Sequence, residues 1–355
     1  MKCLNLKMKK FLYLLIICVF FNVFTTDVIL KQTKAESYCE AVLAVDGGRI
    51  LYENRSMERR PIASTTKIIT AFTVIKNYDL KKQITVKKEW TGIEGSSVYL
   101  KEGETFTVEE LLYGLMLRSG NDCAVTLACA LAGSEKAFAE KMNDLAKECG
   151  ATSSHFVNPH GLHDDEHYST AYDLALITAK ALKNDEFAKI VSTKKFTAGG
   201  EEPRVWINKN KLLFNYEFAT GVKTGYTKKA GRCLVSSAEK NGFKVVCVVL
   251  DCPPMFERSK ELLESAFKKY KNVLLASKDR AVATVPVGKT NVYLPLYVKE
   301  DIYYPLTNDE LYDVQIKILP DEIKRLPVKF CKECGSIKIY LKKQLLFDEK
   351  IFTII

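Results

Sequence analysis

The chain has 355 residues, 47% of them hydrophobic, with 11 cysteines and a formal net charge of +10. This length can bury one sizeable core and leaves room for a smaller second domain. Without its first 35 residues the net charge is +5, and no basic run is dense enough to indicate nucleic-acid binding. This mild excess of positive charge suits a protein near an anionic wall or membrane surface, and ordinary solvated surface charge explains it equally well.

The first 35 residues have the pattern of an export signal. Lysines at positions 2, 7, 9 and 10 precede an uncharged apolar run over 11–24, and Ala35 closes a small-residue site before Glu36. The run is on the short side of the roughly 20 apolar residues that span a bilayer. We therefore expect a signal peptide and an extracytoplasmic protein, at the cell wall or the outer face of the cytoplasmic membrane. An uncleaved segment that associates with the membrane is the alternative.

The next part of the chain runs from a hairpin pattern to a long helix. The stretch AVLAVDGGRILY over 41–52 predicts two strands around a Gly-Gly turn, and apolar residues at 68, 72 and 75 predict a helix from Ser64. Further helices are expected at 108–117, 121–132, 134–149, 170–182 and 257–270, and strands at 220–224, 233–239 and 244–250. Strands at both ends with helices between them predict an α/β fold, in which helices pack on an antiparallel sheet.

The chain after Asp279 has a different character. The β-rich runs VATVPV, NVYLPLYV, DVQIKIL and SIKIYL alternate with Pro, Gly and Asn breaks, and LLFDEKIFTII is expected to form a closing strand. This pattern predicts a small all-β sandwich. We expect three segments: a signal peptide over 1–35, a main domain over 36–276 and a C-terminal β-sandwich over 277–355.

The cysteines and histidines do not indicate a metal site. Nine cysteines follow position 35, an odd number that cannot pair completely, and we expect mostly free thiols that behave as small hydrophobes. Cys331 and Cys334 supply half the ligands of a zinc ribbon, without a second pair. The histidines at 155, 160, 163 and 167 match no zinc signature. No metal and no other cofactor is expected.

One candidate for chemistry is a serine with a lysine three residues later. Ser64-Thr65-Thr66-Lys67 would bring a hydroxyl and an amine to the same face of a helix. The amine can take the serine proton if desolvation or nearby cations lower its pKa from about 10.4. If Ser64 opens the helix, its backbone N–H can hold an oxyanion. The pair alone is not specific, because the same spacing occurs at Ser192/Lys195, Ser237/Lys240 and Ser265/Lys268.

A second candidate, Ser119-Gly120-Asn121, lies between two expected helices. It has the composition of an ordinary helix cap or turn. In a catalytic interpretation Ser119 relays a proton to the leaving amine, and Asn121 donates its amide to the substrate's peptide oxygen.

The third candidate, Lys223-Thr224-Gly225, follows an expected strand. Its lysine and threonine offer a charge and a hydroxyl to a terminal carboxylate, and Gly225 lets a substrate backbone approach the strand edge. A plain β-turn is the alternative. The three elements occur in this order, 55 and 104 residues apart, which is typical of class A β-lactamases and penicillin-binding proteins. We expect them to line one pocket.

With the segments PIASTTKIITA, RSGNDCA, FVNPHGL and GVKTGYTKKAGRCLVSSA, the chain resembles the low-molecular-mass penicillin-binding proteins that act as serine D-alanyl-D-alanine carboxypeptidases. The resemblance runs from Tyr38 to the end. It implies that the enzyme removes the terminal D-alanine from peptidoglycan stem peptides through an acyl-enzyme, and that β-lactam antibiotics inhibit it covalently.

The resemblance also implies roles for single residues. Ser64 would be acylated, Lys67 would be its base and Ser119 would assist proton transfer. Lys223 and Thr224 would grip the terminal carboxylate, and the backbone N–H groups of Ser64 and Tyr226 would form the oxyanion hole. Lys209 stands where some relatives have arginine and lacks the bidentate fork of that side chain, so no role is assigned to it.

Two rival functions share parts of this pattern. A class A β-lactamase needs a Glu-x-x-Leu-Asn segment for deacylation, which is absent from the chain, and the β-rich tail has no place in that enzyme. A non-catalytic wall-binding protein with the same fold would be expected to lose the nucleophile or the base, and both Ser64 and Lys67 are present. Transpeptidation, with an amine in place of water as acceptor, uses the same acyl-enzyme and stays open.

Overall fold

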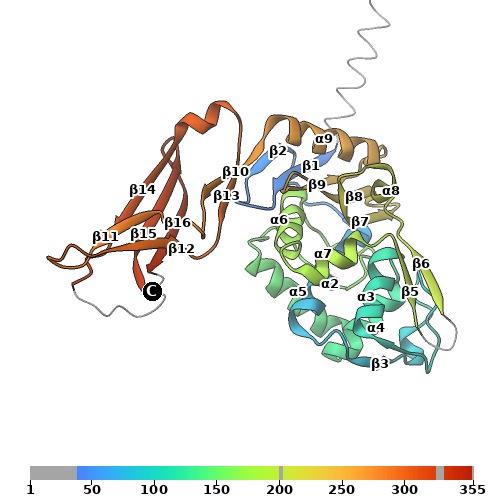
Figure 1. The fold of residues 1–355 in the computed structure, drawn as a ribbon. Coiled ribbons are helices and arrows are strands. Elements are labelled where there is room, and N and C mark those ends of the chain that lie inside the picture. Colours follow the sequence, from blue (N-terminus) through green and yellow to red (C-terminus); the bar gives the residue numbers. More distant parts are fainter. Residues whose placement is uncertain (1–37, 200–202, 325–331, 354–355) are drawn as a thin grey trace, which may run out of the picture.

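A computed structural model describes residues 38–199, 203–324 and 332–353. The expected signal segment and Cys331 lie outside these ranges. Figure 1 shows a larger part built of helices and a sheet, beside a smaller part built of strands. Within the described ranges, the helices are too short or too polar to traverse a lipid bilayer.

The larger part is organised around an antiparallel sheet of five strands in the order β2-β1-β9-β8-β7. Helix α6 covers one face, where it contacts β1 and β9, and helix α9 packs on β8 and β9 from the other. Alternate residues of β1 therefore enter two different cores, with Leu43 in one and Val42 in the other. The bounds are β1 (Cys39–Ala44), β2 (Ile50–Asn54), β7 (Ala219–Thr227), β8 (Gly231–Lys240), β9 (Phe243–Leu250), α6 (Ala171–Ala181) and α9 (Met255–Lys269).

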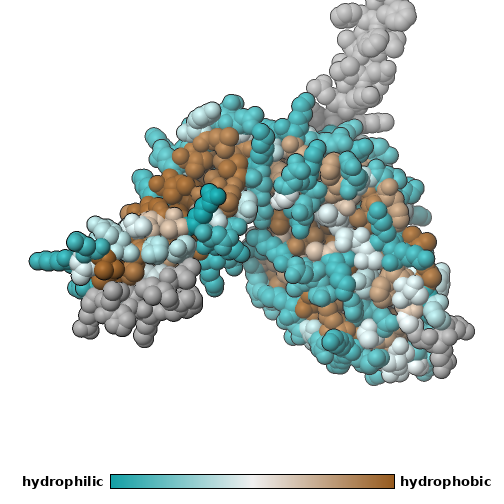
Figure 2. All heavy atoms as spheres, viewed as in Figure 1, coloured by the Kyte–Doolittle hydropathy of each residue, from teal (hydrophilic) through white to brown (hydrophobic). Residues whose placement is uncertain are grey.

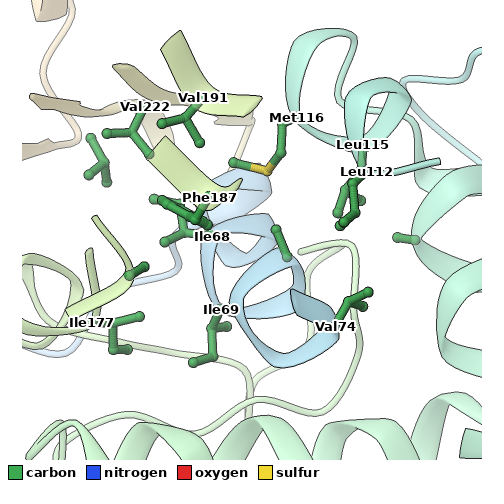
Figure 3. Close-up of a cluster of buried hydrophobic side chains, with 14 of the residues drawn as sticks. Ile68, Ile69, Val74, Leu112, Leu115, Met116, Ile177, Phe187, Val191 and Val222 are labelled. Atoms are coloured by element: carbon green, nitrogen blue, oxygen red, sulfur yellow. The ribbon is translucent and has the colours of Figure 1, made fainter. Parts of the chain in front are cut away.

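Helix α2 (Lys67–Asn77) lies at the centre of the helical layer. It contacts all five other helices on this side of the sheet. Figure 3 shows Ile68, Ile69 and Val74 of α2 among side chains from α3, α6, α7 and β7. The surrounding helices are α3 (Val108–Leu117), α4 (Asn121–Ala132), α5 (Glu135–Glu148), α6 and α7 (Asp185–Ser192). The buried face of the helix that carries the candidate base is thus held by its neighbours.

Most expected elements are present, with small shifts at their ends. The helices expected to begin at Ser134 and Thr170 begin one residue later, because these side chains accept hydrogen bonds from Ala137 N and Asp173 N as N-caps. Several short elements were not predicted, and most of them offer too few residues for a recognisable period. These are α7, α8 (Leu212–Asn215), the β3–β4 pair (Gln83–Thr85, Thr105–Thr107), the β5–β6 pair (Lys195–Ala198, Arg204–Ile207) and the β10–β13 pair of the smaller part (Lys271–Ala276, Ile302–Leu306).

The smaller part is all-β, as expected, and it has its own core. Its main sheet has the order β11-β12-β16-β15-β14, and β10 pairs separately with β13. Together with the layered α/β part, this confirms the predicted fold class. The bounds are β10 (Lys271–Ala276), which joins the two parts, β11 (Ala283–Pro286), β12 (Tyr293–Val298), β13 (Ile302–Leu306), β14 (Val314–Pro320), β15 (Glu333–Leu341) and β16 (Gln344–Thr353).

The two parts meet over a narrow junction, visible between the two lobes in Figure 2. Arg49, in the turn between β1 and β2, donates to both carboxylate oxygens of Glu310 at 2.7 and 2.8 Å and to the carbonyl oxygen of Pro305 at 2.9 Å. Its guanidinium also lies 4.9 Å from the ring centre of Tyr270 and 5.6 Å from that of Tyr304. A bidentate, half-buried arginine of this kind fixes geometry as well as charge.

Candidate active site

Ser64 lies in a 3-10 turn (Ala63–Thr66) that runs directly into α2. The expectation that Ser64 itself opens the α-helix is therefore corrected by one turn, since Lys67 is the first residue of α2. The Thr65 hydroxyl donates to Ile62 O at 2.6 Å and the Thr66 hydroxyl donates to Ala63 O at 2.8 Å. Ala63 has φ +49, a left-handed conformation that a residue with a side chain keeps only when its surroundings hold it.

The amine of Lys67 is completely buried beside Ser64. Its Nζ lies 3.1 Å from Ser64 Oγ, 2.7 Å from Asn121 Oδ1 and 2.6 Å from the carbonyl oxygen of His160. Burial, followed by the positive charge of Lys223, lowers the pKa of Lys67 well below its ordinary value. The site therefore has the desolvation and the nearby cation that a lysine base requires.

The Ser119-Gly120-Asn121 element forms the turn between α3 and α4. Ser119 is 4% exposed and has φ +65, so the turn is tightly wound. The Asn121 amide donates to Glu94 O at 2.5 Å, its Oδ1 accepts from Lys67, and its backbone N–H donates to Ser96 O at 2.7 Å. Asn121 thus ties the Lys67 amine to the loop that contains residues 94–100.

Asp122 supports this loop and was missed by the sequence analysis. Its fully buried carboxylate accepts hydrogen bonds from the hydroxyl of Ser97 at 2.6 Å and from the backbone N–H groups of Val98, Leu100 and Cys123 at 3.0–3.2 Å. The segment SGND contains a signal for this role. Its aspartate begins an otherwise apolar helix, and a carboxylate that is buried there must accept hydrogen bonds from nearby donors.

Lys223, Thr224 and Gly225 all lie within β7, an end strand of the sheet, whereas the expected strand ended at Thr224 and the element was expected to follow it. The correction follows from the β7–β8 pairing, which continues through these residues to Thr227. A Cβ atom on Gly225 would lie 3.2 Å from Ser64 N and 3.1 Å from Thr65 N. A side chain at this position would press on the nucleophile turn, and glycine avoids that contact.

The side chains of this strand differ in exposure. Lys223 is 1% exposed and donates to Thr224 O at 2.9 Å. Burial, with a smaller effect of the Lys209 charge, lowers the pKa of Lys223 to about 7. Thr224 is half-buried, and Tyr226 is exposed, with the guanidinium of Arg232 5.7 Å from its ring centre. A buried cation near its titration point is well suited to pair with an incoming carboxylate.

Lys209, for which no role was expected from the sequence, is a third positive charge that acts on the site, beside Lys67 and Lys223. Its Nζ donates to Ser96 Oγ at 3.1 Å and its backbone N–H donates to Leu117 O. Its positive charge lowers the pKa of both Lys67 and Lys223. Its side chain therefore contributes to the electrostatics of the site without a bidentate contact.

The histidine-rich segment 155–167 packs against the nucleophile turn. The carbonyl oxygen of His160 accepts from Lys67, while the His160 ring lies 3.3 Å from a carboxylate oxygen of Glu135. The His167 ring contacts Thr66 Oγ1 at 2.8 Å. In the part of the chain that the structure describes, no three His, Cys, Asp or Glu side chains are grouped to hold a metal ion.

Comparison with protein families gives two matches that follow one another along the chain. Residues 25–253 match the D-alanyl-D-alanine carboxypeptidase family, and residues 270–353 match the C-terminal domain of penicillin-binding protein 5. D-alanyl-D-alanine carboxypeptidase DacF of Bacillus subtilis is 31% identical, over 97% of this chain and 93% of that protein. DacA of Escherichia coli is 31% identical over 87% of this chain and 80% of its own length.

Solved structures agree with this result. Penicillin-binding protein 5 from Haemophilus influenzae has a TM-score of 0.74 at 25% identity, covering 89% of this chain and 96% of that one. The Streptomyces K15 DD-transpeptidase has a TM-score of 0.62 at 33% identity, covering 65% of this chain and 96% of the other. The first similarity includes the all-β part.

Proposed function

Because this chain belongs to the D-alanyl-D-alanine carboxypeptidase family of serine peptidases, we propose that Ser64 is the nucleophile with which it removes the terminal D-alanine from peptidoglycan stem peptides. The observation that carries this assignment is the buried Lys67 amine, 3.1 Å from the Ser64 hydroxyl oxygen. Penicillins would acylate the same serine. No cofactor takes part in the proposed reaction.

Lys67 acts as the general base in the proposed mechanism. A neutral amine has two N–H bonds and one lone pair, and the oxygens of Asn121 and His160 accept both N–H bonds at 2.7 and 2.6 Å. The lone pair is left for the hydroxyl proton of Ser64. Ser64 Oγ then bonds to the substrate carbonyl carbon, and the proton passes through Ser119 to the leaving nitrogen as the C–N bond breaks. Water, activated by the same base, releases the shortened peptide.

The substrate binds along the free side of β7 in this proposal. Lys223 and Thr224 pair with its terminal carboxylate, and that negative charge stabilises the protonated form of Lys223. The backbone N–H groups of Ser64 and Tyr226 hold the oxyanion, with Gly225 permitting the short distance between strand and turn. The Asn121 amide, which has one N–H bonded to Glu94, has a second N–H for the substrate's peptide oxygen.

The family acts on the cell wall, so we place the enzyme outside the cytoplasm, exported by the segment 1–35. The catalytic domain comprises 36–276 and the β domain 277–355, with β10 at the junction pairing with β13. Retention of an uncleaved signal segment would hold the enzyme at the outer face of the cytoplasmic membrane.

Labelling with a fluorescent penicillin, together with release of D-alanine from a muropeptide ending in D-Ala-D-Ala, tests the proposal. Ser64→Ala abolishes both signals, and Lys67→Met slows acylation by about 10²–10⁴-fold. Ser192→Ala is the matched control, because exposed Ser192 has the same spacing to Lys195. Label retained for minutes supports a carboxypeptidase, whereas rapid loss of label indicates a β-lactamase and an unlabelled wild-type protein indicates a non-catalytic wall-binding protein.

A further inference from the structure

His167 is a buried histidine that the proposed mechanism does not use. It is 3% exposed and stands edge-on to the Phe156 ring, with ring centres 5.7 Å apart. Its two ring nitrogens have different partners: Nδ1 lies 3.2 Å from Val157 N, and Nε2 lies 2.8 Å from Thr66 Oγ1. Thr66 in turn donates to Ala63 O at 2.8 Å.

These contacts determine where each proton lies. The N–H of Val157 can only donate, so Nδ1 of His167 carries a lone pair, and the neutral ring carries its proton on Nε2. Nε2–H therefore donates to Thr66 Oγ1, and the hydroxyl proton of Thr66 is left for Ala63 O. The result is a directed chain of three hydrogen bonds that ends on the carbonyl group preceding the nucleophile.

The last bond of the chain orients a group in the proposed oxyanion hole. Ala63 C=O and Ser64 N–H belong to one planar peptide unit and point in opposite directions. A hydrogen bond that holds the carbonyl of Ala63 toward Thr66 therefore directs the N–H of Ser64 to the other side, where Gly225 of β7 packs. A hydrogen bond to the carbonyl also polarises the peptide and strengthens its N–H as a donor.

The surroundings of this peptide are built to hold it in one orientation. Ala63 has φ +49, so the peptide does not adopt its position by default. A Cβ atom on Gly161 would lie 2.0 Å from Ala63 O and 2.8 Å from Thr66 Oγ1, which shows that the segment carrying the histidines packs its backbone directly on the same carbonyl.

From this geometry we propose that His167 is a positioning residue for the oxyanion hole, which acts through Thr66 on the Ala63–Ser64 peptide. The proposal rests on the assignment of Ser64 as nucleophile.

The charge state of His167 supports the directed chain. Burial lowers its pKa to about 3, helped most by the neighbouring His160 ring and opposed by Asp164. The ring stays neutral at the pH values at which the enzyme would work, and protonation would place a second N–H against that of Val157.

The inference is tested by removing either end of the chain and measuring two rates with a fluorescent penicillin. In Thr66→Val, which keeps the shape of the side chain, and in His167→Leu, acylation and deacylation both slow by about 10- to 100-fold, because both steps pass through an oxyanion. Thr66→Ser and His167→Gln, which restore a hydroxyl and an N–H donor, recover most of each loss. His155→Gln, in the same segment, is the control and labels at the wild-type rate.

A double variant separates this role from a general loss of stability. Once Thr66 is Val, adding His167→Leu slows acylation less than about threefold further, because both residues act through one chain. Wild-type rates in a folded Thr66→Val protein, or slow acylation with unchanged deacylation, would overturn the inference. If the His167→Leu protein does not fold, the Thr66→Val result alone decides. A wild-type protein that is not labelled at Ser64 would instead overturn the proposed function.

Discussion

Asp122 offers a sharp test of how the site is held, because one buried carboxylate satisfies four donors. In Asp122→Asn the amide oxygen can replace Oδ1, but the amide NH₂ replaces Oδ2. There it faces the buried N–H of Leu100 and the hydroxyl of Ser97, which must turn to accept a hydrogen bond from the amide. One buried donor without an acceptor costs about 1–3 kcal/mol, and the three remaining hydrogen bonds each lose about 1 kcal/mol with the charge. The free energy of unfolding is expected to fall by about 4–6 kcal/mol.

Thermal unfolding followed by circular dichroism measures this effect. In a domain of this size such a loss lowers Tm by about 10 °C or more. Ser97→Ala, which removes a single donor, should cost about 1 kcal/mol. Asp144→Asn is the matched control, since its carboxylate is 74% exposed, and it should stay within about 0.5 kcal/mol of the wild type. An Asp122→Asn protein within about 1 kcal/mol of the wild type would refute the reasoning.

Two further predictions concern the titration of the site and its steric limits. The pH dependence of kcat/KM is expected to be bell-shaped, because Lys67 must lose its proton to act as a base, while Lys223, with a pKa of about 7, must keep its proton to bind a carboxylate. Lys209→Gln removes a positive charge that lowers both pKa values, so both limbs should move to higher pH, and unchanged limbs would contradict the assignment. Gly161→Ala should cost about 2–5 kcal/mol in chemical denaturation, through its φ of +86 and a Cβ 2.0 Å from a carbonyl oxygen. Gly133→Ala is the control, because Gly133 has φ +85 but open space around the Cβ, so only the backbone strain of about 1–2 kcal/mol is expected. Equal losses of stability at both glycines would show that the contact with the carbonyl oxygen has no effect.

Much of the fold could be predicted because its signals are local. The helices at 108–117 and 121–132 have the expected bounds, since their apolar residues recur with the helical period. A capping box at Thr107 marks the start of the first helix, and Gly133, in the left-handed conformation, marks the end of the second. The strands of three or four residues carry no such period, and the β5–β6 pair was missed for that reason. The extension of β7 past Thr224 was also missed, because Gly225 resembles a turn residue when its neighbours in space are unknown.

The chain order of Ser64, Lys67, Ser119 and Lys223 is enough to recognise the family and its chemistry, because each short element is local: one helical turn, one turn between helices or one strand. The chain order does not determine how these elements pack against one another. Only the tertiary structure places Asn121 and His160 on the Lys67 amine, 54 and 93 residues away in the chain, and lowers its pKa by burying it. Burial and long-range contact belong to the whole packed chain, so Asp122, Gly161 and His167 acquire their importance only in the folded protein.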